Sequence, residues 1–223
     1  MMRPGLIVIW NDILPEARSD FLAWHSREHI PERVSIPGFL RGQRWFGEEA
    51  SPQYLTVYDT RDAAVLTSEA YLQRLNNPTP WTRSAVAAFR NTARAAGERL
   101  WQSSESCGGM VLAARLDPEP QQITEVADRL MAGTLSSLAR APGIARVRLA
   151  ASVRSASQIQ TAERSVRSGD VREPAISLLV EGFDGREALQ DAFNKAADAE
   201  PALGAAVTGI YALQFDLVAG SID

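Results

Sequence analysis

Hydrophobic and polar residues alternate with strand-like and helix-like spacing along the chain, and these patterns occur in the same order in its two halves. In the first half, apolar or alternating runs predict strands at residues 6–10, 39–46, 54–58 and 95–102. Segments with the helical period predict helices at residues 15–30, 61–75 and 81–93. Pro15 suits a first helical turn, and Pro31 disfavours continuing the first helix beyond residue 30. The predicted order is β-α-β-β-α-β.

The second half repeats this order. Its predicted strands cover residues 110–116, 144–152, 175–181 and 209–218, and its predicted helices cover residues 122–140 and 186–199. Pro142-Gly143 follows Pro37-Gly38 by 105 positions, and a predicted strand precedes each pair. The polar stretch 154–172 adds 17 residues to this half and predicts a long hairpin or a mobile loop. The Ser- and Gly-rich residues 103–109 predict a linker.

Two β-α-β-β-α-β units in tandem predict an α+β fold made of two ferredoxin-like units. Because the bare face of each sheet must be covered, we expect the units to pack sheet to sheet as an intramolecular α+β barrel. Residues 1–103 form the first predicted unit, which carries both histidines, and residues 109–223 form a second, structural unit. The outer surfaces stay free for a homodimer. An ordinary α+β protein with an accidental repeat is the alternative.

Composition narrows the class of protein. The 223 residues are 45% hydrophobic and 22% charged, as in soluble globular proteins. The net charge of −4, without a basic run, argues against nucleic-acid binding. The apolar run 6–10 is too short for a signal-peptide core or a membrane span, and Cys107 has no partner for an internal disulfide. We therefore expect a cytoplasmic protein with no membrane partner.

Both histidines of the chain lie in one predicted helix. His25 and His29 are four residues apart, so they share a face, and that face also carries Trp24 and other apolar residues. Burial disfavours a charged imidazole and lowers its pKa. A neutral imidazole suits a general base or a metal or heme ligand. The alternative is a core pair bonded to the backbone or to Glu28.

Residues 25–29 also read His-x-x-Glu-His, the pattern of one class of zinc proteases. In that chemistry two histidines and a third ligand hold the metal. Pro31 ends the predicted helix directly after His29, and Glu105, the candidate third ligand, falls in the predicted linker. We therefore predict no metal site.

Aromatic residues concentrate in the first unit, which contains all five tryptophans. Tyr54 and Tyr58 share one strand face, and we expect this face to point into the barrel if the aliphatic face packs on the helices. Polar-tipped aromatics suit a planar, weakly polar ligand, although packing is the alternative. The predicted ligand-binding residues are Trp24, Trp45, Tyr54, Tyr58 and Trp81. Trp81 follows a double-proline break and is the candidate lid, or else a packing anchor.

Arg41 shares a strand face with Trp45 by the period of two. A guanidinium at this place would clamp an anionic or enolate oxygen, which makes Arg41 a candidate catalytic residue beside His25 and His29. A surface salt bridge is the alternative.

The first unit carries Trp24-His25-x3-His29-Ile30-Pro31, followed by Pro37-Gly38-Phe39. On these residues the chain resembles the dimeric α+β barrel superfamily, in particular its EthD-like branch, and residues 75–82 (LNNPTPWT) resemble a bacterial group with tandem units. The superfamily includes cofactor-free monooxygenases, muconolactone isomerases, polyketide cyclases and heme proteins. The resemblance implies proton-transfer roles for His25 and His29. The second unit departs from the pattern because it has no histidine.

Three hypotheses about function follow. The first is an enzyme that performs proton transfer or cofactor-free oxygenation on a small aromatic, lactone or polyketide-like compound, with Arg41 or a tyrosine stabilising the enolate. The second is a non-catalytic module that binds a small-molecule ligand. The third is a heme protein with an axial histidine, the only one of the three that predicts a cofactor.

Overall fold

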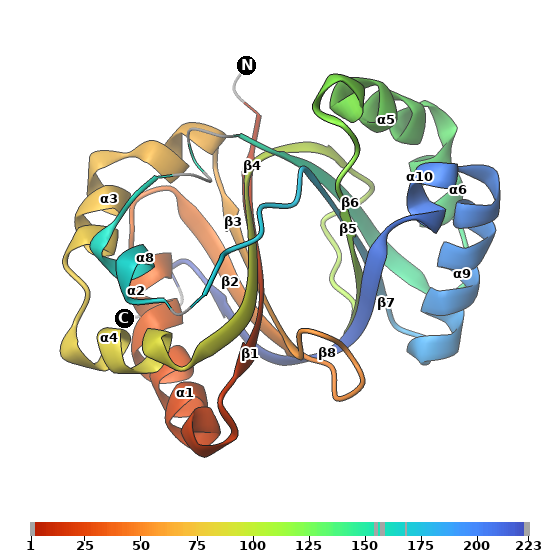
Figure 1. Cartoon of the computed structure of the whole chain (residues 1–223). Helices are drawn as coiled ribbons and strands as arrows, with labels where there is room; N and C mark the ends of the chain where they lie inside the picture. Colours follow the sequence, from red (N-terminus) through yellow and green to blue (C-terminus); the bar gives the residue numbers. More distant parts are fainter. Residues whose placement is uncertain (1–2, 154–155, 157–158, 168, 221–223) are drawn as a thin grey trace.

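The computed structural model describes residues 3–153, 156, 159–167 and 169–220, and the strands of this part close into one antiparallel barrel (Figure 1). The strands are β1 (Gly5–Ile13), β2 (Phe39–Phe46), β3 (Tyr54–Thr60), β4 (Phe89–Gln102), β5 (Met110–Leu116), β6 (Ile144–Ser152), β7 (Ile176–Gly182) and β8 (Val207–Val218). Around the barrel they run β1-β3-β2-β8-β5-β7-β6-β4, and β4 pairs with β1.

Each half contributes four adjacent strands in the same relative order. The first half gives β4-β1-β3-β2 and the second gives β8-β5-β7-β6, which is the ferredoxin-like arrangement. The halves join through β2 with β8 and through β4 with β6. The predicted α+β fold class, with its intramolecular barrel, is confirmed.

Helices cover the outside of the barrel in two groups (Figure 1). The first group contains η1 (Pro15–Ala17), α1 (Arg18–Trp24), η2 (His25–His29), α2 (Ile30–Val34), η3 (Ala63–Thr67), α3 (Glu69–Asn76) and α4 (Pro80–Ala87). The second contains η4 (Pro120–Gln122), α5 (Ile123–Arg129), η5 (Leu130–Thr134), α6 (Leu135–Ala139), α9 (Gly185–Ala199) and α10 (Pro201–Gly204). No helix of the described part has both the length and the apolar character needed to cross a membrane.

Side chains alternate between the barrel interior and the helix layer along each strand. On β1, Leu6, Val8 and Trp10 belong to the interior cluster, whereas Ile7 and Ile9 pack under the helices of the first half. The apolar layer of the second half, which includes Leu130 and Leu178, packs under α5, α6 and α9. Apolar side chains therefore pack both inside the barrel and between the barrel strands and the surrounding helices.

The first helical segment extends beyond its predicted end. It continues through Val34, because η2 is a π-helical turn in which the Ile30 N–H bonds to the His25 carbonyl. Pro31 then stands in the first turn of α2, directly after the π-helical turn.

The predicted helix 81–93 is wrong at its end. α4 stops at Ala87, and Phe89 begins β4 by pairing with Ile13. The alanine-rich residues have helical propensity, but pairing with β1 overrides it.

The polar stretch 154–172 contains a helix rather than a hairpin in its described part. α8 (Ala162–Val166) starts with the Thr161 side chain accepting from the Arg164 N–H, and it lies against α3 and α4 of the first half (Figure 1). The rest of the predicted loop includes residues 154–155, 157–158 and 168, which lie outside the described residues. A segment of the second half thus covers helices of the first.

Candidate functional site

The histidine pair lies between the helices and the sheet of the first half. His25 and His29 are 3% and 6% exposed, as the predicted apolar face requires. Their rings stack with centroids 5.5 Å apart, and the Trp24 ring lies 4.3 Å from that of His29. Phe21 stacks on His25 at 5.0 Å. Aromatic packing therefore fixes both imidazole rings.

Both imidazoles are neutral at pH 7. Burial lowers the pKa of each ring well below 6.5, and the neighbouring cations, among them Arg33, lower it further. The Nδ1 atoms of His25 and His29 are enclosed without a hydrogen-bond partner among the described residues. Glu28 is not their partner, because its carboxylate accepts from the Thr79 hydroxyl at 2.6 Å. The Nδ1 atom of each ring is therefore unused as a hydrogen-bond donor or acceptor among the described residues.

A cavity of about 40 Å³ adjoins His29 but not His25. Its polar and titratable lining consists of His29, Arg33, Tyr58, Tyr71, Arg94, Thr161, Glu163, Arg164 and Arg167. Its apolar lining consists of Ile7, Ile9, Leu75, Ala156, Ile159 and Val171. A space of this size holds a few water molecules. Among the described residues that line this cavity, the structure therefore places His29 and not His25.

The two tyrosines of β3 face the helices, which corrects the prediction that they point into the barrel. Leu55 and Val57 point into the barrel interior instead, where they pack in the same cluster as Trp10 and Trp45. Tyr58 lines the cavity, and its enclosed hydroxyl has no partner among the described residues. Burial raises the pKa of Tyr58, so the phenol is protonated. Tyr54 packs edge-on against Phe21 at 4.9 Å, away from the cavity.

Arg33 is the cation closest in sequence to the pair on its C-terminal side, four residues after His29. It is 3% exposed, and its guanidinium binds Glu163 of α8 and Glu32 of α2, the latter at 3.1 Å. The other oxygen of Glu163 binds Arg167 Nη2 at 3.1 Å. An ion-pair network from both halves of the chain therefore closes the cavity.

Arg41 and Trp45 do not belong to this site. They share a face as predicted, but the face points into the barrel, where Trp45 is fully buried. Arg41 forms a two-pronged pair with Asp216 of β8, at 2.6 and 2.5 Å, and these hydrogen bonds raise the pKa of Arg41. The anion clamp predicted at Arg41 is thus occupied by a carboxylate of the chain itself.

Trp24 and Trp81 act as packing anchors in the described structure. Trp24 Nε1 donates to Thr82 Oγ1 at 3.1 Å, which ties α1 to α4. Trp81 Nε1 donates to Asp20 at 3.0 Å on the outer surface, and its ring does not line the cavity. The structure thus places Trp81 with the packing alternative, away from the His29 cavity, and the lid role stays a prediction.

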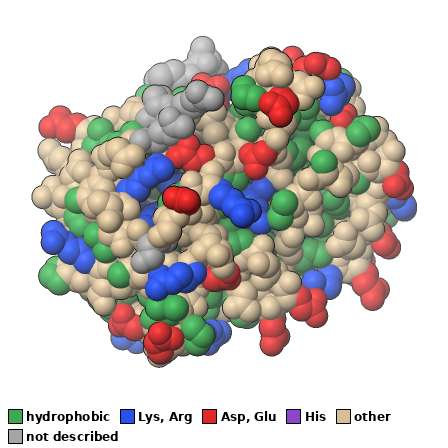
Figure 2. Space-filling model, in the orientation of Figure 1, with side chains coloured by type: hydrophobic (Ala, Val, Ile, Leu, Met, Phe, Trp, Pro, Cys, Tyr) green, Lys and Arg blue, Asp and Glu red, His purple; other side chains and the backbone are tan. Residues whose placement is uncertain are grey.

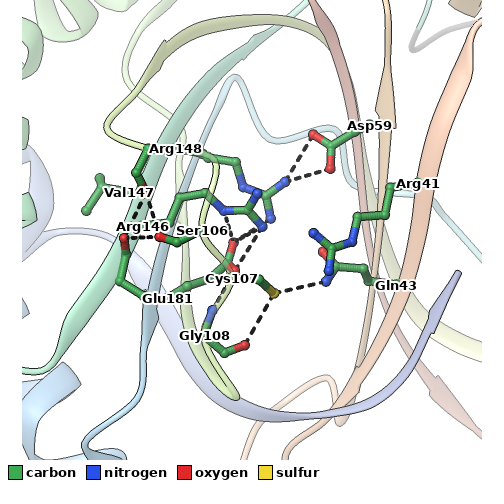
Figure 3. Close-up of polar contacts among 12 residues, drawn as sticks. Arg41, Gln43, Asp59, Ser106, Cys107, Gly108, Arg146, Val147, Arg148 and Glu181 are labelled. Atoms are coloured by element: carbon green, nitrogen blue, oxygen red, sulfur yellow. Dashed lines mark hydrogen bonds and ion pairs between the residues drawn. The ribbon is translucent and has the colours of Figure 1, made fainter. Parts of the chain in front are cut away.

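A second polar cluster lies inside the barrel (Figure 3). Arg148 is fully buried and binds Asp59 at 3.0 Å and Glu181 at 2.7 Å. Arg146 donates two bonds of 2.9 Å to Glu181, and Gln43 Nε2 contacts Cys107 Sγ at 3.5 Å. These charges are paired within the chain, so the cluster joins the two halves rather than offering a binding position.

A wider cleft of about 700 Å³ opens at the barrel end that carries Arg90, Arg115 and Arg172. Figure 2 shows Lys and Arg side chains gathered around the middle of one face of the molecule, and no histidine among its visible side chains. The described lining of the cleft combines three arginines with Asp170 and small or neutral polar residues, and it includes no histidine or tyrosine.

Sequence reasoning missed Arg33, Tyr71, Arg94 and Glu163. Arg33 continues the spacing of His25 and His29, and extending the helix past Pro31 would have identified it. Glu163 carries no local signal, because its contact with Arg33 joins positions 130 residues apart. Among the described residues no group of three His, Cys, Asp or Glu side chains could hold a metal ion.

No family model and no curated protein matches the chain. Solved structures match it over nearly its full length. An anthrone oxidase-like protein is 13% identical, with a TM-score of 0.61 over 99% of this chain and 95% of the other. A candidate monooxygenase from Lactobacillus acidophilus NCFM is 9% identical, with a TM-score of 0.59 over 99% and 98%. A heme-binding protein from Thermus thermophilus is 10% identical, with a TM-score of 0.51 over 96% and 92%. These likenesses establish the α+β barrel fold.

Proposed function

We propose that the cavity beside His29 is an active site that removes a proton from a small organic molecule, next to a carbonyl group or from a phenol. The observation that carries this proposal is the grouping of a neutral imidazole, an unpartnered phenol and a buried guanidinium, on His29, Tyr58 and Arg33, around one void. The three groups make no hydrogen bonds to one another in the described structure. The imidazole and the phenol each keep an unpartnered polar atom, and the guanidinium is paired with Glu32 and Glu163.

Each group has a distinct role in this chemistry. The neutral imidazole of His29 accepts the proton, since its lowered pKa keeps it unprotonated at neutral pH. The Tyr58 hydroxyl and the Arg33 guanidinium donate hydrogen bonds to the oxygen on which negative charge develops. His25 and Trp24 hold the His29 ring in place by stacking.

Two fates of the resulting carbanion need no cofactor. Return of the proton to another carbon completes an isomerisation. Reaction of an activated CH₂ with O₂ gives a C=O group and water, with O₂ supplying the oxygen atom and accepting the electrons. The names of the anthrone oxidase-like neighbour and of the candidate monooxygenase favour the oxygenation.

The ligand must displace part of the cavity wall. A benzene-sized molecule occupies a void of about 150 Å³, several times the space beside His29. The side of the cavity formed by α8 and its neighbours is the part that lies on the outer surface of the first half (Figure 1). Entry therefore involves this side.

Heme is the alternative that the Thermus thermophilus neighbour raises. Protein pockets that hold small molecules or cofactors typically enclose about 300–1,000 Å³. The void beside His29 is about 40 Å³, and the stacked rings of Trp24 and His25 pack the helix side of His29. The residues as arranged do not fit a heme, and none of the proposed steps involves one.

Proton exchange tests the proposal without knowledge of the natural substrate. In D₂O, NMR would follow loss of the α-protons of 2-tetralone, an enolisable aromatic ketone, with an oxygen electrode recording any O₂ uptake. We expect His29→Gln to slow enzymatic exchange by about 10²- to 10⁴-fold. His25→Gln removes a ring that stacks on His29 but does not line the cavity, so we expect a smaller loss of exchange than in His29→Gln.

Exchange that persists in His29→Gln would contradict the proposal. Equal losses in both variants, with equal loss of stability, would mean that the histidines are structural. Binding of 2-tetralone without any exchange would indicate the non-catalytic binding module instead.

A further inference from the structure

The His29 cavity has two walls of different origin. One wall comes from the sheet and helices of the first half and carries Ile7, Ile9, His29, Arg33, Tyr58, Tyr71, Leu75 and Arg94. The other comes from the stretch 156–171 and carries Ala156, Ile159, Thr161, Glu163, Arg164, Arg167 and Val171. We call them the first-half wall and the α8 wall.

Charge is divided unevenly between these walls. Among the described lining residues, the first-half wall has two cations, Arg33 and Arg94, and no carboxylate. The single lining carboxylate, Glu163, belongs to the α8 wall. It is almost fully buried and lies on Arg33, so the first-half wall receives its negative charge from the segment that covers it.

Arg33 has a second anion partner besides Glu163, which is Glu32. Its Nη1 donates to Glu32 at 3.1 Å, and Arg74 also holds Glu32, at 3.3 Å. Glu163 occupies the other terminal nitrogen, Nη2, and both residues line the cavity. The guanidinium is therefore anchored to Glu32 through Nη1, and its partner at Nη2, Glu163, can be exchanged.

Glu163 can leave without becoming an unpaired charge. Arg167, four residues later on the same segment, binds its second oxygen at 3.1 Å. Removing an ion from its partner inside a protein is costly, but the Glu163–Arg167 pair moves as a neutral unit. What remains on the first-half wall, beside His29 and Tyr58, is the Arg33 guanidinium, paired with Glu32 through Nη1 and open at Nη2.

We propose that the ligand of this site is an organic anion, with a carboxylate that replaces Glu163 on Arg33 and an aromatic or aliphatic body. The body would lie against Ile7, Ile9 and Leu75 and the rings of Tyr58 and Tyr71. This inference rests on the proposed function for the location of the site, and it adds the charge of the substrate. Glu163 is then an internal competitor that occupies Arg33 until the matching anion arrives.

Binding of benzoate and of benzamide tests the charge preference, because the two probes share a shape and differ in charge. Isothermal titration would compare the unaltered chain with Glu163→Gln, which removes the competing charge but keeps the size of the side chain. We expect Glu163→Gln to bind benzoate at least about tenfold more tightly, a change of about 1.4 kcal/mol, and to bind benzamide unchanged.

Glu173→Gln is the matched control, since Glu173 pairs with Arg164 of the same segment at 2.9 Å and does not touch Arg33. It should leave benzoate affinity unchanged. The double variant Glu163→Gln/Arg33→Met should lose the gain, and it avoids leaving a buried carboxylate without its partner.

Equal gains for benzoate and benzamide in Glu163→Gln would overturn the proposal, as would a gain that survives in the double variant or no benzoate binding by Glu163→Gln. These outcomes are independent of proton exchange on neutral 2-tetralone. A site with the wrong ligand charge and a site with no catalytic base are therefore distinguishable.

Discussion

The helical segments after β1 and after β5 have the same backbone plan and different chemistry. Every piece of the first, η1, α1, η2 and α2, begins 105 positions before its counterpart η4, α5, η5 or α6. Both segments place a π-helical turn at the same point, His25–His29 in one and Leu130–Thr134 in the other. His25, His29 and Arg33 thus correspond to Leu130, Thr134 and Leu138.

The second segment shows what this backbone does without polar side chains. Leu130 and Leu138 are buried in one apolar cluster with residues of β5, β6, β7 and α9. The π-helical turn is therefore compatible with an ordinary core and is not itself a sign of function. What distinguishes the first half is the set His29, Tyr58 and Arg33 together with the α8 wall.

The largest expected effect on stability comes from replacing Arg33 with leucine, the residue at the corresponding position 138 of the second half. Arg33→Leu leaves Glu163 and Glu32 with one cation fewer, and we expect it to lower the free energy of unfolding by about 3–5 kcal/mol. Urea denaturation measures this loss. Arg33→Leu/Glu163→Leu should recover most of it, and a single variant as stable as the unaltered chain would contradict the buried ion pair.

A truncation in the second half should affect stability alone. Leu130→Ala removes a fully buried side chain, which costs about 2–5 kcal/mol. We expect urea denaturation to show this loss, while proton exchange per folded molecule stays unchanged. Loss of exchange in a folded Leu130→Ala protein would mean that the second half takes part in the chemistry.

The histidine contribution to acid stability should come from the first half only, because the chain has no other histidines. Burial holds the pKa of His25 and of His29 below 6.5, so below about pH 6.5 the unfolded chain binds protons that the folded chain does not. Stability therefore falls as pH falls, by up to about 1.4 kcal/mol per pH unit for each histidine.

Urea midpoints between pH 5 and 7 measure this slope. His25→Leu and His29→Leu should each flatten it. A slope that is the same in the double variant would show that the histidines titrate alike in both states.

The fold could be predicted from the sequence because its signals are local. Alternation and Pro-Gly pairs located β2, β5 and β6 with the bounds that the structure has, and the apolar stripe located the buried face of His25 and His29. Where local propensity competed with pairing, as in the alanine-rich start of β4, the prediction was wrong. The domain division at residues 103–109 stays a prediction.

The site was harder to predict because it depends on which way each strand faces and on distant contacts. The same alternation that groups Tyr54 with Tyr58 does not say which face meets the helices, and the barrel interior took Leu55 and Val57. Arg41 forms an ion pair with Asp216, and Arg33 forms one with Glu163, so each arginine of the first half pairs with a carboxylate of the second half. No local pattern contains either partnership.

Closure of the barrel also decides how copies of this chain can meet. Each strand that the structure describes has a neighbour on both sides, so the described barrel has no strand that is an edge along its whole length. Another chain therefore finds no full edge strand on which to extend the sheet. Any self-association, and any fibril-like stacking under stress, would have to begin on the helical faces or after the seam between β2 and β8 or between β4 and β6 has separated.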